Sequence, residues 1–263
     1  LYYNGVLVST NNWVESDWNQ IEIGRNRNAD RPGNYFLDEV RVWDVALSQA
    51  DIQSWMHKPL SSSHPNYSDL QVYFQMNSNS ISGGNNLLDI SGNSNNATLY
   101  NVSGIQTSSS NVPVTDLISS YQTDVESIWS STGTSDSEDS NGLKMSVSST
   151  LAEANFVIFG NNDDNSGTTS SDISGISKRS KREWHLDETG TVSADVKVDI
   201  GDATGHTGTI SAASNYKLLY ATCGGCTFVE LETGDSVSGD VVTFSSVAIK
   251  DGIYAIASAD SNL

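Results

Sequence analysis

Short apolar runs separated by polar turns recur along the whole chain, and this pattern predicts β-strands joined by loops. At residues 4–5, an Asn-Gly pair between two apolar runs predicts a β-hairpin. Residues 20–24 and 35–43 alternate apolar and polar positions, which predicts two further strands. Few segments have the spacing of a helix, so the predicted fold class is all-β.

The exception is one short helix near residues 49–56. It is predicted to begin at Ser48, because Ser48 and Asp51 have the spacing of a capping box. Pro59 is expected to end it, since proline cannot donate a backbone hydrogen bond inside a helix. The side chains expected to face the core are Ala50, Ile52, Trp55 and Met56.

The same pattern divides the chain into three segments. Residues 1–58 contain the hairpin, the two strands and the helix. Residues 59–123 are predicted to form a linker with appended strands, which are expected at residues 70–74, 88–93 and 97–100. Residues 124–263 are predicted to fold as a second β-sandwich, because turn residues separate nearly all of their apolar runs. Its strands are expected at residues 143–148, 155–159, 183–186, 191–199, 216–222, 227–231, 241–244 and 252–257.

Four motifs follow one another in the first segment: Leu1-Tyr2-Tyr3-Asn4-Gly5, Ile23-Gly24-Arg25, Phe36-Leu37-Asp38-Glu39-Val40-Arg41-Val42-Trp43 and Ala46-Leu47-Ser48. With the capped helix, they resemble the C-terminal half of a laminin-G-like, concanavalin-type jelly roll. Residues 70–101 resemble the opening strands of another such unit. The resemblance implies a partial jelly roll. Its missing strands are expected from upstream residues of a longer precursor, or from a neighbouring chain by strand complementation.

The third segment contains the short motifs Phe159-Gly160, Arg182-Glu183-Trp184 and Asp251-Gly252-Ile253-Tyr254. With its surroundings, it is similar to a module repeated in giant secreted, adhesin-like proteins of Bacteroidetes. In those proteins the module alternates with laminin-G-like units. The resemblance implies a secreted or cell-surface protein.

Charge narrows the range of partners. The chain has 13 Lys and Arg against 32 Asp and Glu, which gives a formal net charge of −19. Nucleic acid and anionic membrane surfaces are disfavoured, because both require basic patches. Strong acidity instead attracts divalent cations such as Ca²⁺, which takes oxygen ligands. A membrane span is not expected, since no apolar run approaches the roughly 18 residues that a helix needs.

The two cysteines stand close together as Cys223-Gly224-Gly225-Cys226, between two strand-like runs. A disulfide across a hairpin turn is the favoured interpretation. A redox Cys-x-x-Cys would sit where a strand meets a helix, and a zinc site would need further thiols or paired histidines. An oxidised pair indicates an extracellular or cell-surface location.

Three aspartates are candidate Ca²⁺ ligands. The resemblance implies that Asp38, on the inward face of its strand, orients or ligates an ion at the rim of the jelly roll. Asp163 and Asp164 lie in a loop dense in oxygen donors, which suits Ca²⁺. For Asp38, the alternative is a strand on whose opposite face Glu39 and Arg41 simply pair. For Asp163 and Asp164, the alternative is a solvated loop.

Trp13, Trp18 and Tyr35 are candidate ligand-binding residues, because sugar-binding sandwiches stack aromatic rings against apolar sugar faces. For each of these three aromatic residues, the alternative is a buried position in the core of the sandwich. Glu15 and Asp17 resemble the acidic strand of jelly-roll glycosidases, whose chemistry needs two carboxylates. Gln20 stands where the acid/base residue would be, so no hydrolytic activity is expected there.

Residues 178–182 form the one basic cluster of the sequence, Lys-Arg-Ser-Lys-Arg. It is interpreted as a solvated run whose cations pair locally, with an acidic partner or a protease-sensitive loop as alternatives. The histidines are scattered, with neither metal-ligand spacing nor an adjacent nucleophile; they are His57, His64, His185 and His206.

The predicted function is a non-catalytic extracellular binding or adhesion module, with a glycan or surface polymer as partner. The alternative is a structural repeat whose partner is another copy of itself, in a filament of the cell surface. An enzyme is not predicted, because no group of residues meets the requirements of an active site.

Overall fold

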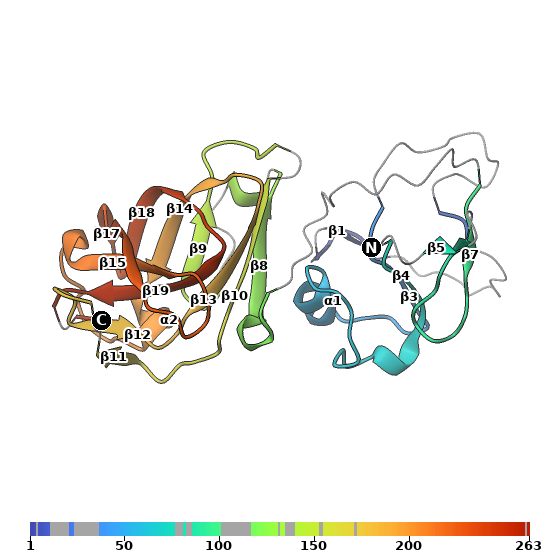
Figure 1. The fold of residues 1–263 in the computed structure, drawn as a ribbon, viewed down its shortest axis with the longest axis horizontal. Helices are drawn as coiled ribbons and strands as arrows, with labels where there is room; N and C mark the ends of the chain where they lie inside the picture. The colour runs from blue at the N-terminus through green and yellow to red at the C-terminus, as the bar shows by residue number, and fades with distance from the viewer. Residues whose placement is uncertain are drawn as a thin grey trace. The chain divides into compact units, whose positions relative to one another are not determined.

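The computed structural model describes residues 1–3, 5–10, 21–23, 37–76, 81–82, 86–100, 117–130, 132–134, 140–152, 155–170, 173–260 and 262–263. The chain divides into two compact units, Leu1–Val112 and Pro113–Leu263 (Figure 1). Strands in sheets dominate both units, which confirms the predicted all-β class. The first unit extends past residue 58, so it includes much of the segment that the sequence pattern set apart.

The first unit contains short strands, one α-helix and one 3-10 helix. Its elements are β1 (Tyr2–Tyr3), β2 (Val6–Leu7), β3 (Val40–Trp43), α1 (Gln49–Trp55), η1 (Tyr67–Asp69), β4 (Leu70–Phe74), β5 (Ile81–Ser82), β6 (Asn86–Leu87) and β7 (Ala97–Thr98). β1 and β2 pair antiparallel around Gly5, whose φ of +71° suits a tight turn, so the predicted hairpin is confirmed.

Helix α1 has the cap that the sequence predicts. The Ser48 side chain accepts a hydrogen bond from the Asp51 backbone N–H, and the Asp51 carboxylate accepts from the Ser48 N–H. Met56 is the C-cap, shortly before Pro59. Ile52, Trp55 and Met56 are half-buried, but Ala50 is exposed, contrary to its predicted inward position.

Strand β3 is shorter than predicted, and residues 21–23 and 88–93 lie in no strand. Glu39 has a φ of +50°, outside the extended region, and β3 begins only after it. β3 pairs antiparallel with β4, with Arg41 opposite Tyr73. Residues 70–74 therefore lie in one sheet with residues 40–43.

Side chains from a polar turn cover the edge of β4 that faces away from β3. Asp89 accepts a hydrogen bond from the Tyr73 N–H at 2.9 Å, and the Ile90 N–H donates to the Tyr73 carbonyl at 3.0 Å. The carbonyl of Gln71 accepts from the Asn95 amide at 2.9 Å. Burial would raise the pKa of Asp89, but backbone hydrogen bonds from Tyr73, Ser91 and Asn95 hold it below its usual value.

The second unit is a β-sandwich. Its strands are β8 (Thr123–Trp129), β9 (Leu143–Ser146), β10 (Phe156–Asn161), β11 (Thr168–Ser170), β12 (Lys178–Ser180), β13 (Trp184–Thr189), β14 (Ser193–Asp199), β15 (Tyr216–Ala221), β16 (Val229–Thr233), β17 (Ser236–Ser238), β18 (Val241–Ala248) and β19 (Gly252–Ser258). Its helices are η3 (Ser119–Tyr121), η4 (Thr132–Thr134), α2 (Ile200–Thr204) and η5 (Ala213–Asn215).

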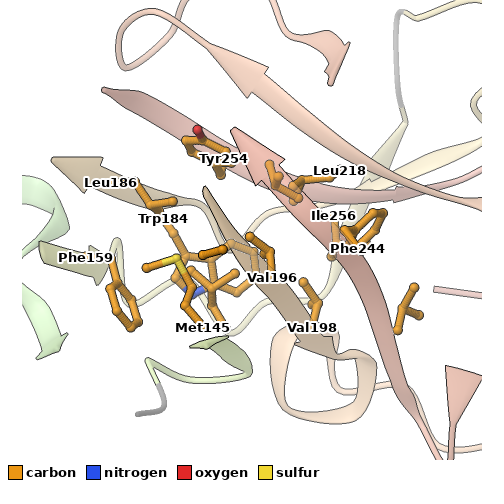
Figure 2. Close-up of a cluster of buried hydrophobic side chains, with 14 of the residues drawn as sticks. Met145, Phe159, Trp184, Leu186, Val196, Val198, Leu218, Phe244, Tyr254 and Ile256 are labelled. Carbon is orange, nitrogen blue, oxygen red and sulfur yellow. The ribbon is translucent and has the colours of Figure 1, made fainter. Parts of the chain in front are cut away.

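One sheet has eight strands in the order β11-β12-β19-β13-β10-β8, with β15 paired to β19 and β16 paired to β15. The other has the order β17-β18-β14-β9. Alternate side chains of both sheets point into one shared core (Figure 2). Its largest fully buried side chain is Trp184, whose indole N–H donates to the Ser140 carbonyl at 2.6 Å.

Each of the eight strands predicted for residues 124–263 overlaps an observed strand. Four more strands, β8, β11, β12 and β17, were not predicted. Nor was helix α2, which Asp199 caps by accepting from the Asp202 N–H and which ends at Gly205 with a φ of +75°.

Candidate functional site

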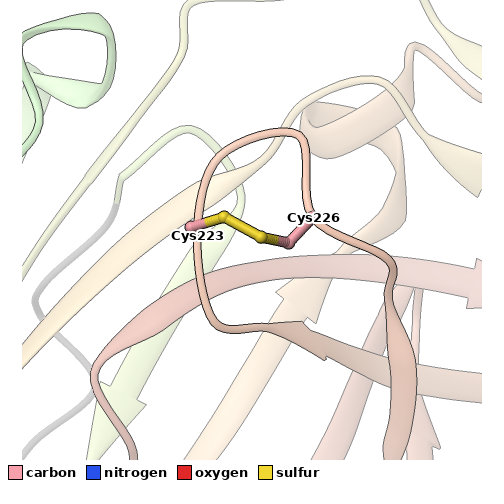
Figure 3. The surroundings of a disulfide bond; sticks show 2 residues. All are labelled: Cys223 and Cys226. Carbon is pink, nitrogen blue, oxygen red and sulfur yellow. A yellow bond between two sulfur atoms is a disulfide. The ribbon is translucent and has the colours of Figure 1, made fainter.

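Cys223 and Cys226 form a disulfide at the tip of the β15–β16 hairpin, as predicted (Figure 3). The Cys226 N–H donates to the Cys223 carbonyl at 3.1 Å, which closes the turn. Cys223 is exposed, whereas Cys226 is half-buried against apolar side chains. The two cysteine residues therefore differ in exposure.

Beneath this turn lies a second apolar cluster, which we call the outer-face cluster. It consists of Tyr121, Ile176, Leu219, Ala221, Phe228, Ile253, Ala255 and Ala257, with Cys226 and Ile173 packed against it. Along β15, Leu218 belongs to the sandwich core and Leu219 to this cluster. Because neighbouring strand residues point to opposite faces, the cluster covers the outer face of the large sheet.

A polar network borders the outer-face cluster. The Tyr121 hydroxyl donates to Glu183 at 2.7 Å, and Arg179 pairs with the same carboxylate at 2.9 Å. The Arg179 guanidinium lies 4.8 Å from the centroid of the Phe228 ring, which is cation–π geometry. Burial and the Glu183 carboxylate raise the pKa of Tyr121. The sequence alone could not indicate the Tyr121–Glu183 contact, since these residues lie 62 positions apart in the chain.

The basic cluster at residues 178–182 is part of the sandwich rather than a solvated run. Ser180 and Arg182 are buried, while Arg179 pairs with Glu183, so the expected local pairing is found for Arg179. Lys181 donates to Ser166 at 3.2 Å. The Nε and Nη1 atoms of Arg182 are buried without a hydrogen-bond partner among the described residues.

Asp163 and Asp164 lie in a loop of successive side-chain turns after β10. The Asp163 N–H donates to Asn161 at 2.8 Å, and the Asp164 N–H donates to Asn162 at 3.2 Å. Asp164 itself accepts from the backbone and the hydroxyl of Ser166, which lower its pKa. These contacts hold the backbone of the loop in its turns.

Asp38 is half-buried and accepts from the Glu39 N–H at 3.0 Å. Glu39 pairs with Arg41 at 2.7 Å, as the sequence allowed. Arg41 also donates to the Trp55 and Lys58 carbonyls, at 2.8 and 2.5 Å. Arg41 thus ties the C-terminal end of α1 to β3.

His64 lies between two tryptophans in the first unit. Its ring centroid is 4.5 Å from that of Trp43 and 5.0 Å from that of Trp55. Nδ1 accepts from the Asn66 N–H at 3.0 Å, while Nε2 is buried without a hydrogen-bond partner among the described residues. Burial lowers the pKa of His64. Lys58 is also buried, with its ammonium 4.8 Å from the Trp55 ring centroid.

The remaining candidates, Trp13, Trp18, Tyr35, Glu15, Asp17 and Gln20, lie outside the described residues. Where side chains are described, no three His, Cys, Asp or Glu residues form a group that could hold a metal ion. Among the described helices, none has the length and apolar character needed to cross a membrane.

Two family profiles match the chain. One, described as a domain of unknown function (DUF8202), matches residues 93–253. The other, described as the concanavalin A-like lectin/glucanases superfamily (Laminin_G_3), matches residues 1–53. No curated protein and no solved structure matches the chain. The laminin-G-like resemblance of the first segment is therefore confirmed over residues 1–53.

Proposed function

The chain belongs to the DUF8202 family through residues 93–253, and we propose that it is a non-catalytic extracellular module that binds glycans in an adhesive surface protein. The observation that supports this best is the match of residues 1–53 to the concanavalin A-like lectin/glucanases superfamily. Within that region β3 is paired in a sheet and α1 is capped and docked by Arg41.

Two further observations agree with an extracellular role. A disulfide closes the β15–β16 hairpin, and disulfides persist in oxidising compartments. The net charge of −19 favours solubility and opposes binding to polyanions. The proposed partner is therefore a neutral or weakly charged glycan or surface polymer.

The proposal assigns sugar stacking to Trp13, Trp18 and Tyr35, with Asp38, Asp163 and Asp164 as candidate Ca²⁺ ligands. The test is a glycan array probed with the full 263-residue chain, once with Ca²⁺ and once with EDTA. We expect specific binding that falls at least about tenfold in Trp13→Ala or Trp18→Ala. Stacking of a nucleic-acid base on an aromatic side chain contributes about 1–3 kcal/mol, and we expect a contribution of the same order from an apolar sugar face.

The matched control is Tyr100→Ala in the same unit. Tyr100 is 75% exposed, and no ligand-binding role is proposed for it. Binding should survive this substitution, and no reducing sugar should be released from any bound polysaccharide. A chain that binds no glycan under either condition would overturn the proposal, as would cleavage of a bound glycan.

The second candidate function is a self-assembling repeat. The observation that favours it is the apolar surface at the start of the first unit, where Leu1, Tyr3, Leu7 and Val8 are exposed. Sedimentation velocity distinguishes the two functions, because self-assembly makes the sedimentation coefficient rise with protein concentration. A concentration-independent monomer would count against the repeat.

A further inference from the structure

We propose that the Cys223–Cys226 disulfide is a thiol-exchange site, and that its opening uncovers the outer-face cluster. This inference concerns the second unit and does not depend on glycan binding. It rests on the unequal exposure of the two cysteine residues and on the packing of Cys226 against the cluster.

The reactivity of the disulfide depends on which cysteine an external thiol can reach. Thiol–disulfide exchange needs access to one sulfur along the direction of the S–S bond. Cys223 is exposed, whereas Cys226 is half-buried and packs against the outer-face cluster. An external thiolate therefore attacks Sγ of Cys223, and Cys226 is the leaving group.

The exchange balances with a low-molecular-weight thiol as the reductant. The thiolate forms a bond to Sγ of Cys223, the Cys223–Cys226 bond breaks, and its electron pair leaves on Sγ of Cys226, which takes a proton from water. A second thiolate then attacks the external sulfur of the mixed disulfide. It releases Cys223 as a thiolate, together with the oxidised form of the small thiol.

The disulfide turn covers part of the outer-face cluster. Cys226 packs against the cluster that includes Tyr121, and a Cβ added to Gly224 would come within 3.5 Å of the Tyr121 hydroxyl oxygen, so the turn lies beside this ring. Phe228 follows the turn directly and is buried in the cluster, against the Arg179 guanidinium. Tyr121 and Arg179 in turn share the Glu183 carboxylate.

The disulfide thus restricts the motion of the chain segment that includes Phe228. This restriction keeps Phe228 packed against Arg179 and in the cluster with Tyr121. Reduction removes this restriction, and the loop-closure entropy of the turn then favours opening. The sandwich core lies on the other face of the sheet and contains neither cysteine. Opening is therefore expected to be local, and to leave the strands of both sheets paired and the sandwich core packed.

The experiment treats the purified full chain with dithiothreitol at neutral pH without denaturant. Alkylation followed by mass spectrometry counts the thiols, and hydrogen exchange reports on opening. We expect two alkylated cysteines. We also expect exchange at residues 173–177 and 223–228 to accelerate roughly tenfold, in line with the loop-closure entropy of a short disulfide loop. Exchange in β14 and β18 should not change.

Single substitutions test the assigned order of attack. In Cys226→Ser, the remaining Cys223 should react with oxidised glutathione at least about tenfold faster than Cys226 does in Cys223→Ser, because exposure controls access. Equal rates would contradict the assignment. Reduction that requires denaturant, or that leaves exchange at residues 223–228 unchanged, would show a purely structural disulfide and overturn the proposal.

Discussion

The hydroxyl of Tyr73 donates a hydrogen bond of 2.5 Å to Oε2 of Glu39, 34 residues earlier in the chain. The same hydroxyl accepts from the Leu60 N–H at 3.0 Å, and Arg41 donates to the same Glu39 oxygen at 2.7 Å. Burial and the Glu39 carboxylate raise the pKa of Tyr73 to about 12. One phenol therefore joins β3, β4 and the segment after α1.

We predict that Tyr73→Phe destabilises the first unit. It leaves the Leu60 N–H without its acceptor and removes a donor from the Glu39 carboxylate, both in partly or fully buried positions. Unsatisfied buried polar groups cost about 1–3 kcal/mol each. Urea unfolding should show this loss, and Tyr100→Phe, at an exposed tyrosine, should show none. Equal midpoints for the two variants would contradict the role of the phenol.

Acid is predicted to destabilise the first unit through His64. Burial lowers the pKa of His64 below its ordinary value of 6.5, and nearby Arg41 and Lys58 lower it further while Asp51 opposes them. The unfolded chain therefore binds more protons between the lowered value and 6.5. The free energy of unfolding falls as the pH drops through this window.

Unfolding at pH 7.5 and at pH 5.5 (roughly one unit to each side of the ordinary histidine pKa) measures this effect. His64→Asn retains an acceptor for the Asn66 N–H and cannot be protonated in this range, so its stability should change less between the two conditions. An unchanged pH dependence in His64→Asn would show that other groups cause it.

The fold of the second unit could be predicted because its strands follow a simple rule. In β14, apolar residues alternate with polar ones between turns, as in a half-buried strand. The rule failed at residues 178–182, which were interpreted as solvated charge. Here the buried positions are Ser180, the last residue of β12, and Arg182. The local pairing of Arg179 with Glu183 was expected, but the packing of this run against β19 is a tertiary contact that the local sequence does not show.

In the first unit, the prediction failed where a side chain replaces the backbone as a hydrogen-bonding partner. Leu88 to Asn93 has the apolar spacing of a strand, but Asp89 and Ser91 use their side chains to bond the backbone of β4. Of the candidate site, the disulfide and the local ion pairs of Arg41 and Arg179 follow from local spacing. The Tyr121–Glu183–Arg179 network depends on tertiary contacts.

Trp184→Phe is predicted to destabilise the second unit by about 2–4 kcal/mol, from the lost ring volume and the lost indole hydrogen bond to the Ser140 carbonyl. Trp184 is fully buried and donates to Ser140 at 2.6 Å. The matched variant is Trp129→Phe, at a half-buried position on the edge strand β8, which should cost less. Guanidinium unfolding followed by circular dichroism compares the two. A larger loss for Trp129→Phe would be inconsistent with this core.

Gly160→Ala is predicted to disturb the pairing of β10 with β8. The register of these strands shifts between Phe159 and Asn161, and a Cβ on Gly160 would overlap the Tyr121 carbonyl. Overpacking costs about 1–3 kcal/mol, so the melting temperature should fall by several degrees. Gly224→Ala, where a Cβ meets only ordinary contacts, is the control. Similar melting temperatures for both would mean that β8 moves aside without cost.

The turn at Asp89 occupies the outer edge of β4 in the β3–β4 sheet. An open strand edge normally recruits any extended segment that can match its donors and acceptors, including the edge of another molecule. On β4, the Gln71 carbonyl accepts from Asn95, and the N–H and the carbonyl of Tyr73 are bonded by Asp89 and Ile90. These groups of β4 are therefore unavailable to a strand of another molecule, so the turn at Asp89 protects this edge against intermolecular strand addition.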